Sequence, residues 1–129
     1  EKIDINDIDN SFKDLFESET KYNDHIDRRI KFGHIDKNDS NINYFKKTID
    51  CIKNSDIIIL EEYKDYWRKL YFSEKDKWLV ILNEKGQVIT SYKDDKEKLT
   101  AWLEEGKKKL GIKRMEVKND NIRRKIKTL

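Results

Sequence analysis

The amino-acid sequence predicts an α+β domain in which helices come first, a four-stranded antiparallel meander follows, and a helix and a basic tail close the chain. Apolar residues recur at helical spacing between residues 7 and 54, and short β-branched or alternating runs fill residues 57–92. Helical spacing returns over residues 95–110, and the basic tail spans 112–129. Helices followed by a run of strands are typical of the α+β class. The 129 residues fit a single domain.

Two helical segments precede the predicted sheet. Residues 7–31 carry apolar side chains three and four residues apart, but Glu17 to Lys21 lacks an apolar anchor. Either one helix or two helices with a break near Thr20 fits this pattern. Gly33 is a natural stop after the segment. The clearest helix covers residues 40–54. Its apolar face consists of Ile42, Phe45, Ile49 and Ile52.

Four strands are expected next, joined by short polar loops. They cover residues 57–60, 67–72, 77–82 and 87–92. The loop from Asn83 to Gly86 suits a four-residue hairpin in which glycine takes a positive φ. In the last strand, alternation places Val88, Thr90 and Tyr92 on one face. Beyond the helix at 95–110, residues 112–117 suit a short edge strand and 119–129 a basic helix.

Charge is distributed unevenly along the chain. The formal net charge is +3, but residues 1–27 hold nine acidic residues against three lysines. Residues 107–129 hold ten Lys or Arg against two acidic residues. This asymmetry favours a polyanionic partner for the basic end, and a solvated lysine-rich tail is the alternative. The acidic start could also fold back on the basic end.

Composition excludes several classes of protein. A single cysteine excludes an internal disulfide, and Cys51 is expected in the core. No apolar run approaches the roughly 18 residues of a membrane span, so we expect no membrane partner. Two histidines and one cysteine do not make a four-ligand zinc site, and no glycine-rich phosphate loop is present. We therefore expect neither metal nor cofactor. Because the first residue is Glu, we expect a piece of a larger secreted or phage-encoded protein.

The segment from His25 to His34 is the first candidate site. It contains both histidines of the chain, with Arg28, Arg29 and Lys31 between them. Histidine exchanges protons near neutral pH, and arginine grips phosphate through paired hydrogen bonds. On a helix, His25 and Arg29 would share one face. The alternative is structural, with His25 a surface helix residue and His34 a loop residue beside the glycine stop.

The predicted sheet holds the second candidate set. Lys69 and Tyr71 share a face of one strand, Thr90 and Tyr92 share a face two strands later, and Arg68 points opposite to Lys69. Together they predict a polar and aromatic sheet face. Aromatic rings stack on bases, and cations meet backbone phosphates. The alternative is an ordinary solvated sheet face.

Residues 22–93 resemble the metal-independent ribonuclease superfamily that groups barnase, EndoU, the tRNA-cleaving colicins and RelE-like toxins, called BECR. Its phage-associated and contact-dependent toxin branches are the most similar. The matching residues are His25 with Ile26, Arg68 or Lys69, and the hairpin from Gly86 to Tyr92. The EndoU branch uses two histidines and other branches use one, which leaves the role of His34 open. The helix at 95–110 and the basic tail lie outside the resemblance.

The resemblance implies a toxin that cleaves RNA, with tRNA among the candidate targets. The ribose 2′-hydroxyl attacks the adjacent phosphate and leaves a 2′,3′-cyclic phosphate. The implied roles are His25 and His34 as acid and base, Arg29, Arg68 and Lys69 on the phosphate, Thr90 as a hydrogen-bond donor, and Tyr92 as a ring that stacks on a base or donates a hydrogen bond. Such a toxin would act in the cytoplasm and pair with an acidic immunity or antitoxin protein.

Two other functions fit the sequence. One is a non-catalytic protein-binding module, such as a phage-encoded inhibitor of a host protein, in which the histidines would not matter. The other is a nucleic-acid binder that works through residues 107–129, with a steep dependence of affinity on salt.

Overall fold

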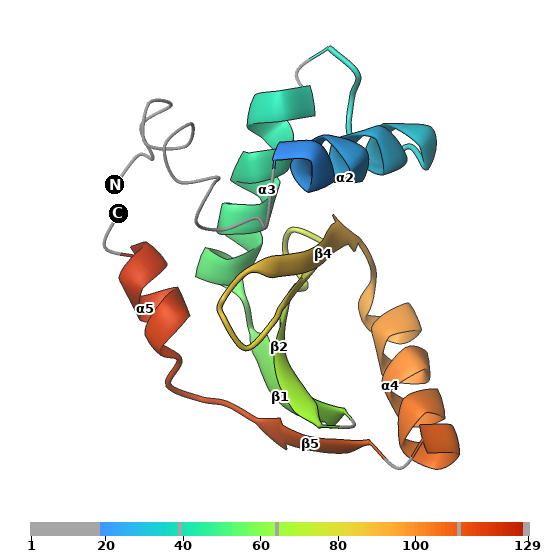
Figure 1. The fold of residues 1–129 in the computed structure, drawn as a ribbon, viewed down its shortest axis with the longest axis vertical. Coiled ribbons are helices and arrows are strands. Elements are labelled where there is room, and N and C mark those ends of the chain that lie inside the picture. The colour runs from blue at the N-terminus through green and yellow to red at the C-terminus, as the bar shows by residue number, and fades with distance from the viewer. Residues whose placement is uncertain (1–18, 39, 64, 111, 128–129) are drawn as a thin grey trace.

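The computed structural model describes residues 19–38, 40–63, 65–110 and 112–127, and shows an α+β fold (Figure 1). The described helices are α2 (Glu19–Lys31), α3 (Ser40–Asn54), α4 (Lys96–Leu110) and α5 (Asn121–Lys127). The strands are β1 (Ile57–Tyr63), β2 (Tyr66–Ser73), β3 (Trp78–Leu82), β4 (Val88–Lys93) and β5 (Lys113–Glu116). The fold class is as predicted. The expected helical residues 7–18 lie outside the described ranges.

The strands form one antiparallel sheet in the order β4-β3-β2-β1-β5. The meander from β1 to β4 is confirmed, and the loop before β4 contains Gly86 at φ +78° as expected. The sheet has five strands rather than four, because the edge strand expected near 112–117 pairs with β1, from Glu62↔Lys113 to Ile59↔Glu116. The expected short edge strand is therefore confirmed as β5.

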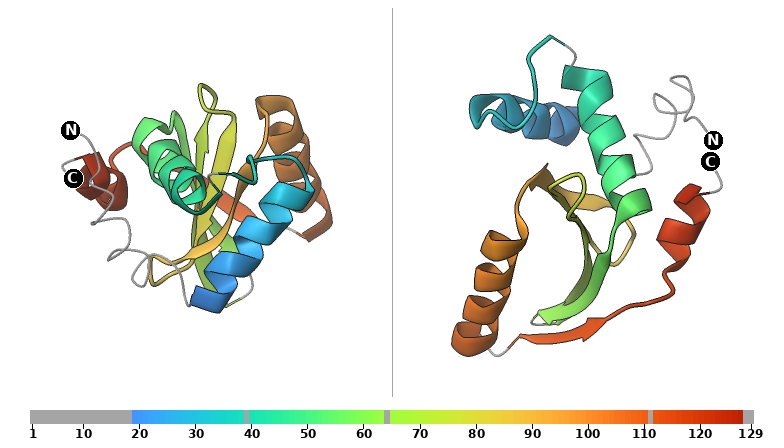
Figure 2. Two further views of the ribbon diagram at one scale, coloured as in Figure 1. Left: turned by 90° about the horizontal axis from the view of Figure 1, so that it is seen from above. Right: turned by 180° about the vertical axis from the view of Figure 1, so that it is seen from behind.

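Helices cover both faces of the sheet (Figure 2). On the α3 face, as we name it, α2, α3 and α5 pack over a core that includes Phe45, Tyr71 and Trp78. On the α4 face, Leu99 of α4 packs against a second cluster that includes Phe72. Cys51 is buried in the first cluster, where its Sγ lies 3.0 Å from the carbonyl oxygen of Trp78. None of the described helices is long and apolar enough to cross a membrane.

A β-bulge in β4 corrects one prediction. Thr90 pairs with Ile81, but the next pair is Val88 with Leu82, so Ile89 has no partner across the ladder. One extra residue reverses the alternation of faces. Val88 therefore joins the core on the α3 face, while Thr90 and Tyr92 lie on the α4 face. The expectation that Val88 shares their face is wrong.

The basic C-terminal segment is part of the fold. Asp120, which is 5% exposed, accepts hydrogen bonds from Lys69 Nζ at 2.6 Å and from the Tyr71 hydroxyl at 2.7 Å. Its carboxylate also accepts the backbone N–H of Arg123 in the first turn of α5. Ile126 of α5 is buried in the α3-face core. After β5, which pairs with β1, the chain is therefore held against the sheet by the buried carboxylate of Asp120 and by apolar side chains that include Ile126.

A buried hydrogen-bond network holds β4 against α3. The Tyr44 hydroxyl donates to the backbone oxygen of Ser91 at 3.0 Å, and Trp78 Nε1 donates to Ser91 Oγ at 2.7 Å. Thr48 Oγ1 lies 2.7 Å from the same Oγ atom. Because Tyr92 follows Ser91 directly, this network fixes where the Tyr92 ring emerges on the opposite face.

Candidate functional site

Arg29 lies near the end of α2 and is only 8% exposed. Its guanidinium carbon is 5.3 Å from the ring centroid of Tyr92 and 5.8 Å from that of Phe32. Its Nε is buried without a hydrogen-bond partner. Within the described residues, no carboxylate forms an ion pair with Arg29 or acts on its charge. Burial lowers the pKa of this guanidinium, which is the expected effect on an uncompensated cation.

His34 follows α2 and turns back toward Arg29. Gly33, at φ +72°, makes the turn, and the backbone N–H of His34 donates to the Arg29 carbonyl oxygen at 2.8 Å. Its Nδ1 lies 3.4 Å from Arg29 Nη1 and accepts the backbone N–H of Lys93 at 3.2 Å. Because two donors point at Nδ1, the neutral ring carries its proton on Nε2.

The surroundings of His34 favour the neutral ring. Burial lowers the pKa of His34, and the charges of Arg29, Lys93 and Lys98 lower it further. At neutral pH the ring therefore presents an Nε2–H donor. It also stacks beside Tyr92, at 6.4 Å between centroids and 25° between planes. Arg29, His34 and Tyr92 form what we call the Arg29 site.

His25 belongs to the neighbouring turn of α2 and is 7% exposed. Its Nδ1 lies 3.4 Å from Arg28 Nη2, and its ring stacks on Tyr44 at 6.4 Å. Little of the imidazole is open to a substrate. Of the two histidines, His34 is the one that the structure places on Arg29 Nη1.

The two basic residues predicted on β2 lie on opposite faces of the sheet. Arg68 faces α4 and pairs with the buried Glu61, with Arg68 Nε 2.6 Å from the carboxylate. Lys69 faces the other way and pairs with Asp120. Because Lys69 and Tyr71 lie on the α3 face, they cannot share a surface with Thr90 and Tyr92. The prediction of one polar sheet face is wrong.

Thr90 and Arg68 remain on the same side of the sheet as Tyr92. Thr90 is half-buried and lies two residues before Tyr92 on β4. Burial raises the pKa of the Tyr92 hydroxyl and Asp94 adds to this, while the charges of Arg29 and Arg68 act in the opposite direction. Tyr92 is thus within electrostatic reach of both arginines.

Two residues that contact the Arg29 site, Phe32 and Lys93, were not predicted from the sequence. Phe32 is 61% exposed, and its ring lies against the Arg29 guanidinium. The sequence signal for this contact was an aromatic residue directly before the glycine that ends the helix. Lys93 contributes its backbone N–H, which no side-chain pattern encodes.

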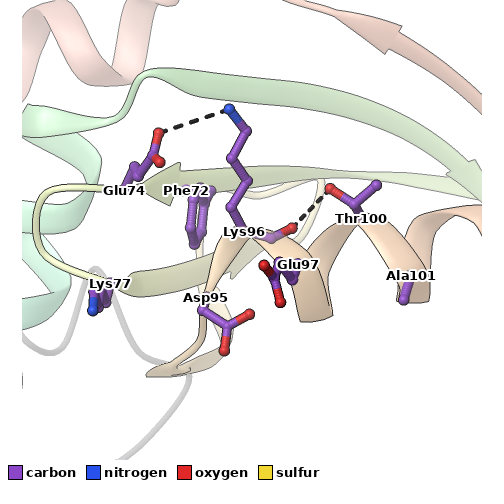
Figure 3. A pocket seen from close by; sticks show the side chains of 8 residues that line it. All are labelled: Phe72, Glu74, Lys77, Asp95, Lys96, Glu97, Thr100 and Ala101. Carbon is purple, nitrogen blue, oxygen red and sulfur yellow. Dashed lines mark hydrogen bonds and ion pairs between the residues drawn. The ribbon is translucent and has the colours of Figure 1, made fainter.

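A cavity of about 720 Å³ opens elsewhere, at the start of α4 (Figure 3). Figure 3 shows Phe72 at its wall, with Lys96 paired to Glu74 at 3.8 Å and Asp95 at the helix start. Neither Arg29 nor His34 lines it. Over the described ranges, no three His, Cys, Asp or Glu side chains gather as a metal site would require.

The chain belongs to the family described as "Uncharacterised protein aq_aa01", whose model matches residues 6–129. No curated protein and no solved structure matches it. The family description specifies no reaction, so a function has to be argued from the Arg29 site itself.

Proposed function

We propose that this protein is a ribonuclease that binds an RNA phosphodiester at the Arg29 site and cleaves it without a metal ion. The observation that carries the proposal is that Arg29 is buried, that its Nε has no hydrogen-bond partner, and that no carboxylate of the described residues pairs with it. An uncompensated buried cation is costly to the folded state. An anionic ligand that approaches this cation recovers the lost interaction, and phosphate matches the geometry of arginine well.

The neighbours of Arg29 favour a nucleic acid over a simple anion. The ring of Tyr92 offers a flat surface on which a base can stack, as aromatic residues do in single-strand binding proteins. His34 offers the Nε2–H donor to a phosphate oxygen. Lys93 and Lys98 are exposed cations whose charges reach His34, and they extend the positive field around the site.

In the proposed reaction the 2′-oxygen of a ribose forms a bond to the adjacent phosphorus, and the bond from phosphorus to O5′ breaks. Water takes the 2′-hydroxyl proton, and water returns a proton to O5′, so the products are a 2′,3′-cyclic phosphate and a 5′-hydroxyl. The phosphoryl oxygens carry extra negative charge in the transition state. Arg29 and the His34 Nε2–H donor stabilise this charge, and one such donor is worth about 10²–10³ in rate.

This proposal gives His34 the role of a hydrogen-bond donor. A general base needs a free lone pair, but Nδ1 already accepts from Lys93 and Nε2 holds the proton. An imidazolium acid would place a second proton on Nδ1, against the positive charge of Arg29. Electrostatic stabilisation is therefore the main catalytic effect that this geometry supports.

The test compares substrates that have a ribose 2′-hydroxyl with substrates that lack a free one. The full chain is incubated in EDTA with total tRNA, with a single-stranded RNA oligonucleotide, and with the same oligonucleotide in 2′-O-methyl and DNA forms. We expect both RNAs to be cut and the other two to stay intact. If wild type leaves all RNA intact, or if DNA is cut equally well, the proposed reaction is wrong.

Two further properties belong to the proposal. A ribonuclease that attacks tRNA would act as a toxin in the cytoplasm. It would require a cognate inhibitor, and an acidic protein would be attracted to the exposed cations around the Arg29 site. Expression of wild type should then arrest bacterial growth, and Arg29→Met should relieve the arrest.

A further inference from the structure

Trp102 of α4 is exposed, whereas Leu99 on the same helix is buried. Leu99, one turn earlier, is 2% exposed and fills the core beneath the helix, and Leu103 packs on the same cluster. Trp102 keeps 38% of its surface open. A large aromatic side chain that the core does not need is a candidate contact for a ligand.

Two guanidinium groups hold the indole of Trp102 in place. The guanidinium carbons of Arg68 and Arg114 lie 5.8 and 5.9 Å from its ring centroid. Such contacts are attractive when the cation lies over the aromatic face. The ring is therefore oriented by its neighbours before any ligand arrives.

Both guanidinium groups are held by the sheet through Glu61 of β1. Glu61, whose side chain is fully buried, binds Arg68 Nε at 2.6 Å and Arg114 Nε at 2.7 Å. Arg114 Nη1 also donates to the Leu103 carbonyl oxygen at 2.5 Å. Its Nη2 would lie 2.7 Å from a Cβ atom at position 106, which explains the glycine there. Arg68 and Arg114 thus place two guanidinium groups beside the ring.

Tyr92, the ring that Arg29 contacts, lies on the same face of the sheet as Trp102. Arg68 and Glu61 are cross-strand partners on the α4 face, where Thr90 and Tyr92 also lie. The charges of Arg29 and Arg68 both act on the Tyr92 hydroxyl. A polyanion that binds Arg29 can therefore continue past Tyr92 toward Trp102.

We propose that Trp102 is the stacking platform of a second nucleotide subsite, where a base of single-stranded RNA lies on the indole while a neighbouring phosphate is bound at the Arg29 site. The guanidinium groups of Arg68 and Arg114 attract the RNA backbone there. Stacking accepts any base, because every base has a flat π face. The inference rests on the proposed function for the identity of the polymer, and its own test is binding.

The experiment measures affinity without cleavage. A fluorescently labelled ten-nucleotide 2′-O-methyl RNA and a matched dinucleotide are titrated with wild type, Trp102→Ala and Trp102→Phe by anisotropy. Trp67→Ala is the control, since Trp67 is 41% exposed and lies on the other face. Thermal unfolding of each variant confirms that it is folded.

We expect Trp102→Ala to weaken binding of the ten-nucleotide RNA about 5- to 100-fold, the range that loss of one stacked base produces. Trp102→Phe should retain most of the affinity, the dinucleotide should be nearly insensitive, and Trp67→Ala should stay within about twofold of wild type. Equal affinities of wild type, Trp102→Ala and Trp102→Phe for the longer RNA would overturn the subsite. Binding that depends on Trp102 in a protein that cuts no RNA would overturn the proposed reaction and leave the subsite standing.

Discussion

Arg29 and His34 meet where the chain leaves helix α2, with Arg29 Nη1 3.4 Å from His34 Nδ1. The backbone reinforces the pairing, because the His34 N–H donates to the Arg29 carbonyl oxygen. The imidazole is thereby fixed as a neutral donor next to a cation with no carboxylate partner within the described ranges. Four predictions test this arrangement and the fold that supports it.

We expect the Arg29 side chain to bind a ligand rather than to stabilise the folded protein. Arg29→Met keeps much of the apolar stem and removes a buried charge that pairs with no carboxylate in the part of the chain that the structure describes, so the free energy of unfolding in urea should stay the same or rise. Arg28→Met is the control, because Arg28 is exposed one position earlier. A loss of more than about 2 kcal/mol in Arg29→Met alone would show that Arg29 is structural.

The His34 ring should make stability depend on pH. Its folded pKa lies below the unfolded value, because burial and then Arg29 disfavour the imidazolium. The unfolded chain therefore binds more protons, and stability falls as pH drops below the unfolded value of about 6.5 toward the folded pKa. His34→Asn keeps an acceptor for the Lys93 N–H and removes this titration. Thermal melts from pH 8 to 5 should show a smaller loss in His34→Asn than in wild type, and parallel curves would contradict the assignment.

The Glu61 carboxylate should contribute strongly to the stability of the protein, because it pairs with both Arg68 and Arg114 on the α4 face. Glu61→Gln leaves Arg68 and Arg114 without a buried counter-charge, and breaking a buried pair costs about 3–5 kcal/mol. Urea unfolding measures the change. Glu62→Gln is the matched control, because Glu62 is exposed and faces away, and it should cost less than about 0.5 kcal/mol. Similar losses in the two variants would contradict this role.

Asp120 should hold the C-terminal segment on the sheet. Burial alone would raise the pKa of its carboxyl, but hydrogen bonds from Lys69, Tyr71 and the Arg123 N–H hold it below its usual value. Asp120→Asn weakens this set by about 1–3 kcal/mol and should expose α5 to limited proteolysis. The exposed Glu116→Gln should not. Equal cleavage of α5 in both would disprove the anchor.

The helices and the meander could be predicted because their apolar periodicity agrees with their final environment. The helix predicted at 40–54 buries apolar residues that the spacing selected, such as Phe45, while α4 buries Leu99 and leaves Trp102 38% exposed. The bulge could not be predicted, since Val88 and Ile89 are both apolar and either could face the core. The short edge strand expected at 112–117 is present as β5, although Met115 is the one apolar residue among its four positions.

The candidate site was only partly predictable for a similar reason. The grouping of Arg29, His34 and Tyr92 follows from a local glycine turn and from the place of β4 beside α2, and all three were candidates. The choice of His34 over His25 as the partner of Arg29 depends on the turn at Gly33 and on Lys93 supplying a backbone N–H. The separation of Lys69 from Thr90 depends on the strand register, which sequence alone does not specify.

The central claim is that Arg29 stabilises the charge on a phosphodiester during RNA cleavage. The most direct measurement is the single-turnover rate of RNA cleavage in EDTA by wild type, Arg29→Met and Arg28→Met, with the fragment ends identified by mass. We predict 2′,3′-cyclic phosphate ends from wild type, a rate about 10²–10³-fold lower for Arg29→Met, and a much smaller change for Arg28→Met. Intact RNA with wild type, or equal rates for wild type and Arg29→Met, would contradict the claim.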